Sequence, residues 1–191
     1  MRMKRKTALL ALFCGCALLP STLLAQPAAP APVLRIVPAK GSPNVVVILL
    51  DDVGFGATSA FGGPIPTPVL EDLARQGLRY NRFHTTSICS PTRASLLTGR
   101  NHHAAGLGTV TEYATGFPGY AGRLSKRTAT LAEMLRPHGY NSLMVGKWHL
   151  MPLREVTAAG PFDAWPLQRG FDRWYGFPAG YTDQWYPELC E

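Results

Sequence analysis

A continuous apolar run occupies 44–50 and reads NVVVILL. A β-branched run of this length predicts a strand that is buried on both faces, as in a parallel sheet. Shorter apolar segments at 78–83 and 140–145 predict two further strands, and the last one halts at Gly146. The chain is therefore expected to build its sheet from these three segments.

Three helices are predicted between the strands, over 68–76, 91–98 and 131–136. The first two begin with a hydroxyl residue followed by proline, and each ends at a glycine. The third begins with a capping box, in which a threonine is followed three residues later by glutamate. In the second helix we expect Ser90 to be the N-cap, which places Cys89 just outside the first turn.

The alternation of strands and helices predicts an α/β fold with a mainly parallel sheet. In such sheets ligands bind beyond the carboxyl ends of the strands. Chemically active side chains follow all three predicted strands, so we expect them to share one edge of the sheet: Asp51 and Asp52, then Cys89 and Arg93, then Lys147 and His149.

The first 25 residues are typical of a secretory signal. Four of the 19 Lys and Arg lie at 2–6, an apolar run follows at 7–19, and small residues precede a cleavage point after residue 25. The run is too short to span a membrane, so we expect export, to the periplasm, with no stable membrane insertion after cleavage. A lipid-modified Cys16 is the alternative, although Phe13 fits a lipoprotein cleavage box poorly.

Proline-rich residues 26–43 predict an extended linker, which leaves 44–191 as the folded domain. Removal of the signal leaves 15 Lys and Arg against 12 Asp and Glu, so the net charge falls from +7 to +3. Nucleic-acid binding would need a basic stripe on the folded domain. No nucleic-acid partner is therefore expected.

Two cysteines remain outside the signal, Cys89 and Cys190. In an exported protein they can pair as a disulfide. Cys89, however, stands at a helix start, where backbone N–H groups and the helix dipole favour a thiolate or a bound anion. Arg93 can reach back over the same place, which suits sulfate or phosphate. A cysteine phosphatase would have five residues between Cys and Arg, whereas three separate them here.

The other strand-end residues also have plain structural interpretations. Paired aspartates after a strand can mark a turn or a helix cap. Lys147 and His149 point the same way in an extended chain and can be ordinary surface groups. Their expected shared location is what indicates a site. Paired carboxylates favour a hard cation such as calcium or magnesium over zinc.

These residues carry a resemblance to a known family. The segment CSPTRASLLTGR resembles the signature of the type I sulfatases, which are arylsulfatases of the alkaline-phosphatase superfamily. NVVVILLDDVGFG resembles the family's first strand and acid pair, and GKWHL resembles its Lys-x-His element. The similarity covers 44–191. It implies the N-terminal part of a doubly wound sheet sandwiched by helices, incomplete at the C-terminus.

The resemblance also implies a mechanism. A maturation enzyme would convert Cys89 to formylglycine, whose hydrated aldehyde attacks the sulfur of a sulfate ester and then expels sulfate. Asp51, Asp52 and the modified Cys89 would bind calcium. Arg93 would stabilise the hydrate, Lys147 would hold a sulfate oxygen, and His149 would accept a proton from the second hydroxyl.

The family's remaining calcium ligands and leaving-group acids lie further along the chain than residue 191. The sequence is therefore interpreted as a fragment or truncated reading frame of a sulfatase. Two alternatives stay open: an inactive truncated remnant, and a phosphate or phosphonate ester hydrolase on the same scaffold. Substrate identity and oligomeric state do not follow from the sequence.

Overall fold

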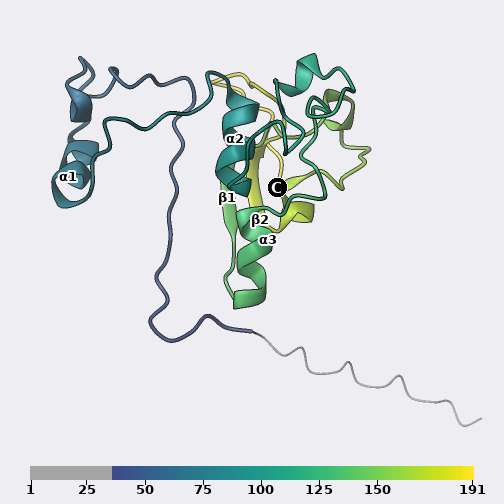
Figure 1. Ribbon diagram of the computed structural model, residues 1–191, viewed down its shortest axis with the longest axis horizontal. Coiled ribbons are helices and arrows are strands. Elements are labelled where there is room, and N and C mark those ends of the chain that lie inside the picture. Colours follow the sequence, from purple (N-terminus) through teal and green to yellow (C-terminus); the bar gives the residue numbers. More distant parts are fainter. Residues whose placement is uncertain (1–35) are drawn as a thin grey trace, which may run out of the picture. The chain divides into compact units, whose positions relative to one another are not determined.

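A computed structural model describes residues 36–191, and the expectations for the signal, Cys16 and residues 26–35 lie outside these residues. Within these residues three α-helices and two strands follow one another along the chain, with short 3-10 helices in several of the connecting loops (Figure 1). They are α1 (Pro68–Gln76), α2 (Cys89–Thr98), α3 (Leu131–Leu135), β1 (Leu143–Lys147) and β2 (Arg173–Phe177). Within 36–191 no helix is long and apolar enough to cross a membrane.

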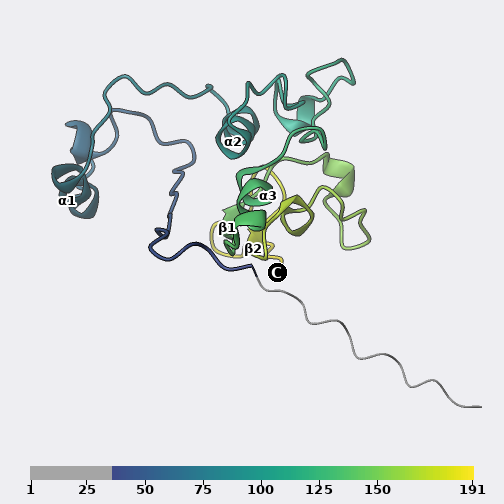
Figure 2. The ribbon, with the colours of Figure 1, turned by 60° about the horizontal axis from the view of Figure 1, so that its bottom comes forward.

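The two strands form a parallel pair, in register from Leu143 opposite Arg173 to Lys147 opposite Phe177. Both views show α3 lying alongside this pair (Figures 1 and 2). Parallel strands joined through helical turns agree with the α/β prediction. The strand predicted at 140–145 is present, although it begins at Leu143 and runs through Gly146 to Lys147.

The strands predicted at 44–50 and 78–83 are wrong. Both segments are irregular, and their apolar side chains are exposed: Val46 is 82% exposed and Leu78 is 82% exposed. A strand needs a hydrogen-bonded neighbour, and in the described part of the chain the only named strand pair is β1 with β2. Without a ladder partner, β-branched composition alone does not make a strand.

The helix predictions hold with one correction. α1 begins at Pro68 and is followed by Gly77, and α3 begins with the expected capping box, in which Thr130 accepts from the Glu133 N–H. The N-cap of α2 is Ile88 rather than Ser90, so Cys89 belongs to the first turn. Ile88 has extended backbone angles and its carbonyl accepts from Thr92 N–H, which starts the helix two residues earlier than predicted.

The hydrophobic core gathers residues from α2 to β2, beginning with Ala94. Trp148 is its largest fully buried side chain. Its indole N–H donates to the carbonyl of Ala164 at 2.9 Å. Its ring packs edge-to-face with Phe171, with 6.1 Å between the ring centroids. Because Trp148 lies between Lys147 and His149 in sequence, its burial fixes the backbone from which those two side chains project.

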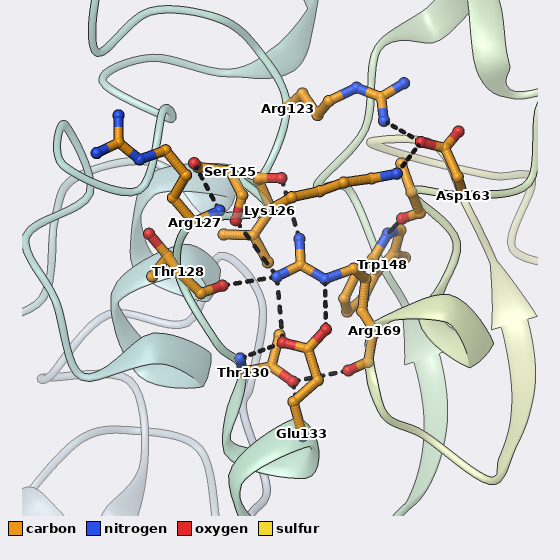
Figure 3. A network of polar contacts seen from close by, with 12 residues as sticks. Arg123, Ser125, Lys126, Arg127, Thr128, Thr130, Glu133, Trp148, Asp163 and Arg169 are labelled. Carbon is orange, nitrogen blue, oxygen red and sulfur yellow. Dashed lines mark hydrogen bonds and ion pairs between the residues drawn. The ribbon is translucent and has the colours of Figure 1, made fainter.

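A buried arginine connects α3 to the loops around it (Figure 3). The Arg169 guanidinium donates to the carbonyls of Leu124 at 3.0 Å and Thr128 at 2.7 Å, and it pairs with Glu133 at 3.0 Å. Thr130 completes the network by donating its hydroxyl to the Arg169 carbonyl at 2.7 Å. The guanidinium of Arg169 thus donates to backbone carbonyls that burial would otherwise leave without a hydrogen bond.

Candidate active site

The first turn of α2 presents Cys89 together with backbone N–H groups that have no partner inside the helix. Gly99 ends the helix with a left-handed conformation, φ 64°. Cys89 is half-buried, and both Cys89 and Cys190 are free thiols, so the alternative of a disulfide between them is wrong. An N-terminal turn of this kind attracts negative charge.

His149 reaches Cys89 from the segment that follows β1. Its Nδ1 lies 3.2 Å from Cys89 Sγ, and its side chain is only 4% exposed. The backbone of His149 has φ 54°, a conformation that is uncommon for residues other than glycine, and its N–H donates to the carbonyl of Pro178 at 3.1 Å. This turn, rather than simple alternation along a strand, aims the imidazole at residue 89.

Glu112 completes this side of the site and was missed by sequence reasoning. It lies in η2 (Thr111–Tyr113), and both carboxylate oxygens are 2.9 Å from His149 Nε2. A glutamate in a loop of glycines and hydroxyl residues carries no pattern that would mark it. Only the fold brings it to a histidine 37 residues later.

Asp51, Arg93 and Lys147 form the other side of the site. Lys147 Nζ lies 2.7 Å and Arg93 Nη2 lies 3.2 Å from the Asp51 carboxylate. Arg93 also donates to the carbonyl of Lys147 at 2.7 Å. Both cationic side chains are nearly buried, at 8% and 10% exposed. Two cations against one carboxylate leave this side positively charged, which suits an anion.

The environment sets the charge state of the acids and of the histidine. Burial alone would raise the pKa of Asp51, but hydrogen bonds and charges from Lys147 and Arg93 outweigh it and hold the pKa below its ordinary 3.8. The pKa of Glu112 is lowered in the same way, because its hydrogen bond from His149 overcomes burial.

Burial, joined by the nearby charges of Lys147 and Arg93, lowers the pKa of His149 below its ordinary 6.5, although Glu112 opposes this change. The imidazole is therefore neutral at neutral pH, when the Asp51 and Glu112 carboxylates are ionised. A neutral imidazole has one nitrogen that can accept a proton.

Asp52 lies at the chain position expected for a metal ligand, but its side chain makes no hydrogen bond or ion pair with the other residues of the site. Its backbone has φ 55° and its side chain is exposed. Across residues 36–191 no group of three or more Asp, Glu, His or Cys side chains is placed to hold a metal ion. Calcium takes six to eight oxygen ligands, so Asp51 and Asp52 fit it by chemistry but supply only part of a shell.

Comparison with known proteins identifies the family to which these site residues belong. The family model described as Sulfatase matches residues 43–191. The chain belongs to the sulfatase family. An arylsulfatase of Klebsiella aerogenes is 42% identical to this sulfatase over 142 residues, which are 73% of the chain. Human N-acetylgalactosamine-6-sulfatase is 36% identical over 148 residues, which are 71% of the chain.

A solved structure shows the same fold. This structure was described in connection with glycosaminoglycan metabolism by Bacteroides thetaiotaomicron. It matches 68% of the chain, with a TM-score of 0.54 and 28% sequence identity. The α/β prediction is therefore confirmed, and the fold is that of the alkaline-phosphatase-like sulfatases. The matched part covers 27% of that structure, 29% of the Klebsiella relative and 26% of the human one.

Proposed function

We propose that the complete protein is a sulfuric ester hydrolase of the arylsulfatase type, with formylglycine at position 89. The observation that carries this proposal is that His149 contacts Cys89 in the first turn of α2. Arg93, from the same helix, hydrogen-bonds the Lys147 carbonyl, and Arg93 and Lys147 both pair with Asp51. A sulfate ester carries a negative charge spread over three oxygens, which positive side chains and aligned N–H donors can bind, and this site offers both.

Each side chain has a separate task in the proposed reaction. Lys147 binds a sulfate oxygen, and Arg93 orients residue 89 from one turn along the same helix. His149 holds its Nδ1 toward residue 89 and accepts a proton there. The nearly complete burial of these three side chains excludes water, which strengthens their interaction with a bound anion.

Formylglycine supplies an aldehyde whose hydrate has one hydroxyl for attack on sulfur and a second for the release of sulfate. The thiol of Cys89 is the precursor, and its oxidation requires a separate maturation enzyme and an oxidant. Cys89 is free and half-buried, so its side chain is available for that conversion.

Calcium bound by Asp51, Asp52 and residue 89 would supply further positive charge for the sulfate oxygens. The oxygen-only chemistry of the two aspartates supports calcium over zinc. Asp51 is already paired with Lys147 and Arg93. The remaining oxygen ligands would have to come from water, substrate or other residues.

A single comparison tests the proposal. The full-length protein, co-expressed with a maturation enzyme, is assayed on 4-nitrophenyl sulfate and on 4-nitrophenyl phosphate. We expect sulfate ester turnover that is lost in Cys89→Ala and retained in Cys190→Ala, the matched control at the other free thiol. Turnover of the phosphate ester alone would instead support a phosphate or phosphonate ester hydrolase.

The alternative is that the 191-residue chain by itself is an inactive remnant. Its support is the exposure of the apolar run at 44–50, together with an open apolar pocket lined by Leu50, Leu70 and Phe83. The partial donor set for calcium also favours it. Turnover by the purified 191-residue chain at the rate of the full-length protein would refute this alternative.

A further inference from the structure

Glu112 makes the closest polar contact of His149 on the side away from residue 89. We propose that Glu112 is a positioning residue that fixes the tautomer and the orientation of His149, so that Nδ1 faces residue 89. The inference deepens the proposed function and rests on it. It concerns a residue that neither the sulfatase motifs nor the sequence pattern marks as part of the site.

The geometry determines which nitrogen carries the proton. Both oxygens of Glu112 lie 2.9 Å from His149 Nε2. An ionised carboxylate only accepts hydrogen bonds, so Nε2 must carry the proton and donate it. Nδ1 is then the free acceptor, and it lies 3.2 Å from Cys89 Sγ. The side chain of residue 89, the imidazole base and the orienting carboxylate thus follow one another in a line.

The Cys89 sulfur also marks where an oxygen of the modified side chain would stand, because both are attached to the same carbon. A hydroxyl at that place can pass its proton to Nδ1. The imidazole then carries a positive charge, and the Glu112 carboxylate on the opposite ring nitrogen stabilises it. Glu112 therefore acts through His149 and does not itself touch the substrate.

The surrounding chain leaves room for the contact between Glu112 and His149 and holds Glu112 in place. A Cβ atom on Gly180 would lie 2.8 Å from His149 Nε2 and 2.9 Å from a Glu112 oxygen, so only glycine leaves room for this contact. The Thr111 hydroxyl donates to the second Glu112 oxygen at 3.2 Å. Thr111 is itself buried, which anchors the turn that presents Glu112. The segments that carry Glu112, His149 and Gly180 thus all fit the contact between Glu112 and His149.

The test compares Glu112→Gln with the matched control Glu188→Gln, an exposed glutamate outside the site, in the matured full-length protein. A glutamine can either accept from Nε2 or donate to it, so it no longer enforces one tautomer. We expect kcat on 4-nitrophenyl sulfate to fall at least about 10-fold with KM little changed. Glu112→Asp should recover part of kcat, and Glu188→Gln should match wild type.

Chemical rescue separates positioning from a merely structural role. Glu112→Ala leaves space beside Nε2, and added formate should restore part of its kcat. Formate should not accelerate wild type or His149→Ala. A merely structural loss would lower the folded fraction and the formylglycine content, and formate would restore neither.

A second readout does not depend on turnover. The ¹⁵N shifts of the His149 ring should show Nε2 protonated in wild type and a mixture of tautomers in Glu112→Gln. An inactive wild type would refute the proposed function, and the ring shifts would still test Glu112. An active Glu112→Gln with unchanged kcat and an unchanged His149 tautomer would overturn the inference alone.

Discussion

Lys147 Nζ lies 2.7 Å from Asp51 Oδ2, although the two residues are 96 positions apart in the chain. The lysine side chain is 8% exposed and the aspartate side chain is 36% exposed. The same carboxylate is proposed to bind calcium, and the same ammonium is proposed to bind sulfate. In the proposed site, a cation bound by Asp51 would leave the ammonium free to pair with an incoming anion.

The first prediction concerns Lys147→Met, which keeps the apolar stem and removes the charge. We expect kcat/KM for 4-nitrophenyl sulfate to fall about 10²–10³-fold, because one donor to the developing charge is lost. Calcium should bind at least as tightly as in wild type, because a competing cation leaves Asp51. Lys126→Met serves as control, since Lys126 is 65% exposed and pairs with Asp163. Weaker calcium binding in Lys147→Met would contradict this account.

The second prediction concerns the metal. Chelator-treated full-length protein should lose sulfatase activity and regain it with calcium, and Asp52→Asn should need more calcium for half-maximal activity. Asp183→Asn is the control, because Asp183 is an exposed aspartate that accepts hydrogen bonds from the backbone of its own turn. Full activity after exhaustive chelation would argue against any role of Asp52 in metal binding.

The third prediction concerns the buried arginine of Figure 3. Arg169→Met leaves the carbonyls of Leu124 and Thr128 without donors, so we expect a loss of about 2–4 kcal/mol in the free energy of unfolding. Arg127→Met should change it by less than about 0.5 kcal/mol, because Arg127 is exposed. Denaturant unfolding measures both. Equal effects of the two substitutions would show that the network does not stabilise the fold.

The fourth prediction concerns pH. Burial alone would raise the pKa of Glu133, but hydrogen bonds and charge from Arg169 and Thr130 outweigh it and hold the pKa below its ordinary 4.5. A lowered pKa in the folded state means that Glu133 contributes stability above pH 4.5, and that this contribution disappears as the pH falls through the folded-state pKa.

Glu133→Gln keeps a side chain that can complete the capping box but removes the charge. The melting temperatures of wild type and Glu133→Gln should therefore converge as the pH is lowered from about 6 to about 3. Glu188→Gln should track wild type throughout. A gap between wild type and Glu133→Gln that widens with acid would contradict the assignment.

The sequence predicted the helices better than the sheet, for a physical reason. Helix signals are local: Pro68, Gly77 and the Thr130–Glu133 capping box act within a few residues, and all are seen. Strand signals depend on a partner. The apolar run at 44–50 has no ladder in the described chain, and β2 was missed because its alternation of buried Trp174 and exposed Tyr175 is too short to stand out.

The candidate site also divides into residues that local motifs predict and a residue that only the fold brings into place. Motif spacing indicated Asp51, Cys89, Arg93, Lys147 and His149. The structure joins Asp51, Arg93 and Lys147 in one group of contacts and Cys89 and His149 in another. The expectation that all of them follow strands was wrong, because only Lys147 and His149 lie at a strand end: Lys147 is the last residue of β1 and His149 comes two residues later. Glu112 was not predictable, because its contact with His149 depends on the turn at Thr111 and on the positive φ of His149, and neither is visible in the sequence.

The central claim is that Cys89 is the precursor of an aldehyde, and the mass of one peptide tests it most directly. Trypsin releases 83–93 from the protein isolated from its native source. The account predicts a peptide in which H₂S is replaced by one oxygen atom, and which reacts with a hydrazide probe. An intact thiol in every copy of an enzymatically active preparation would contradict it.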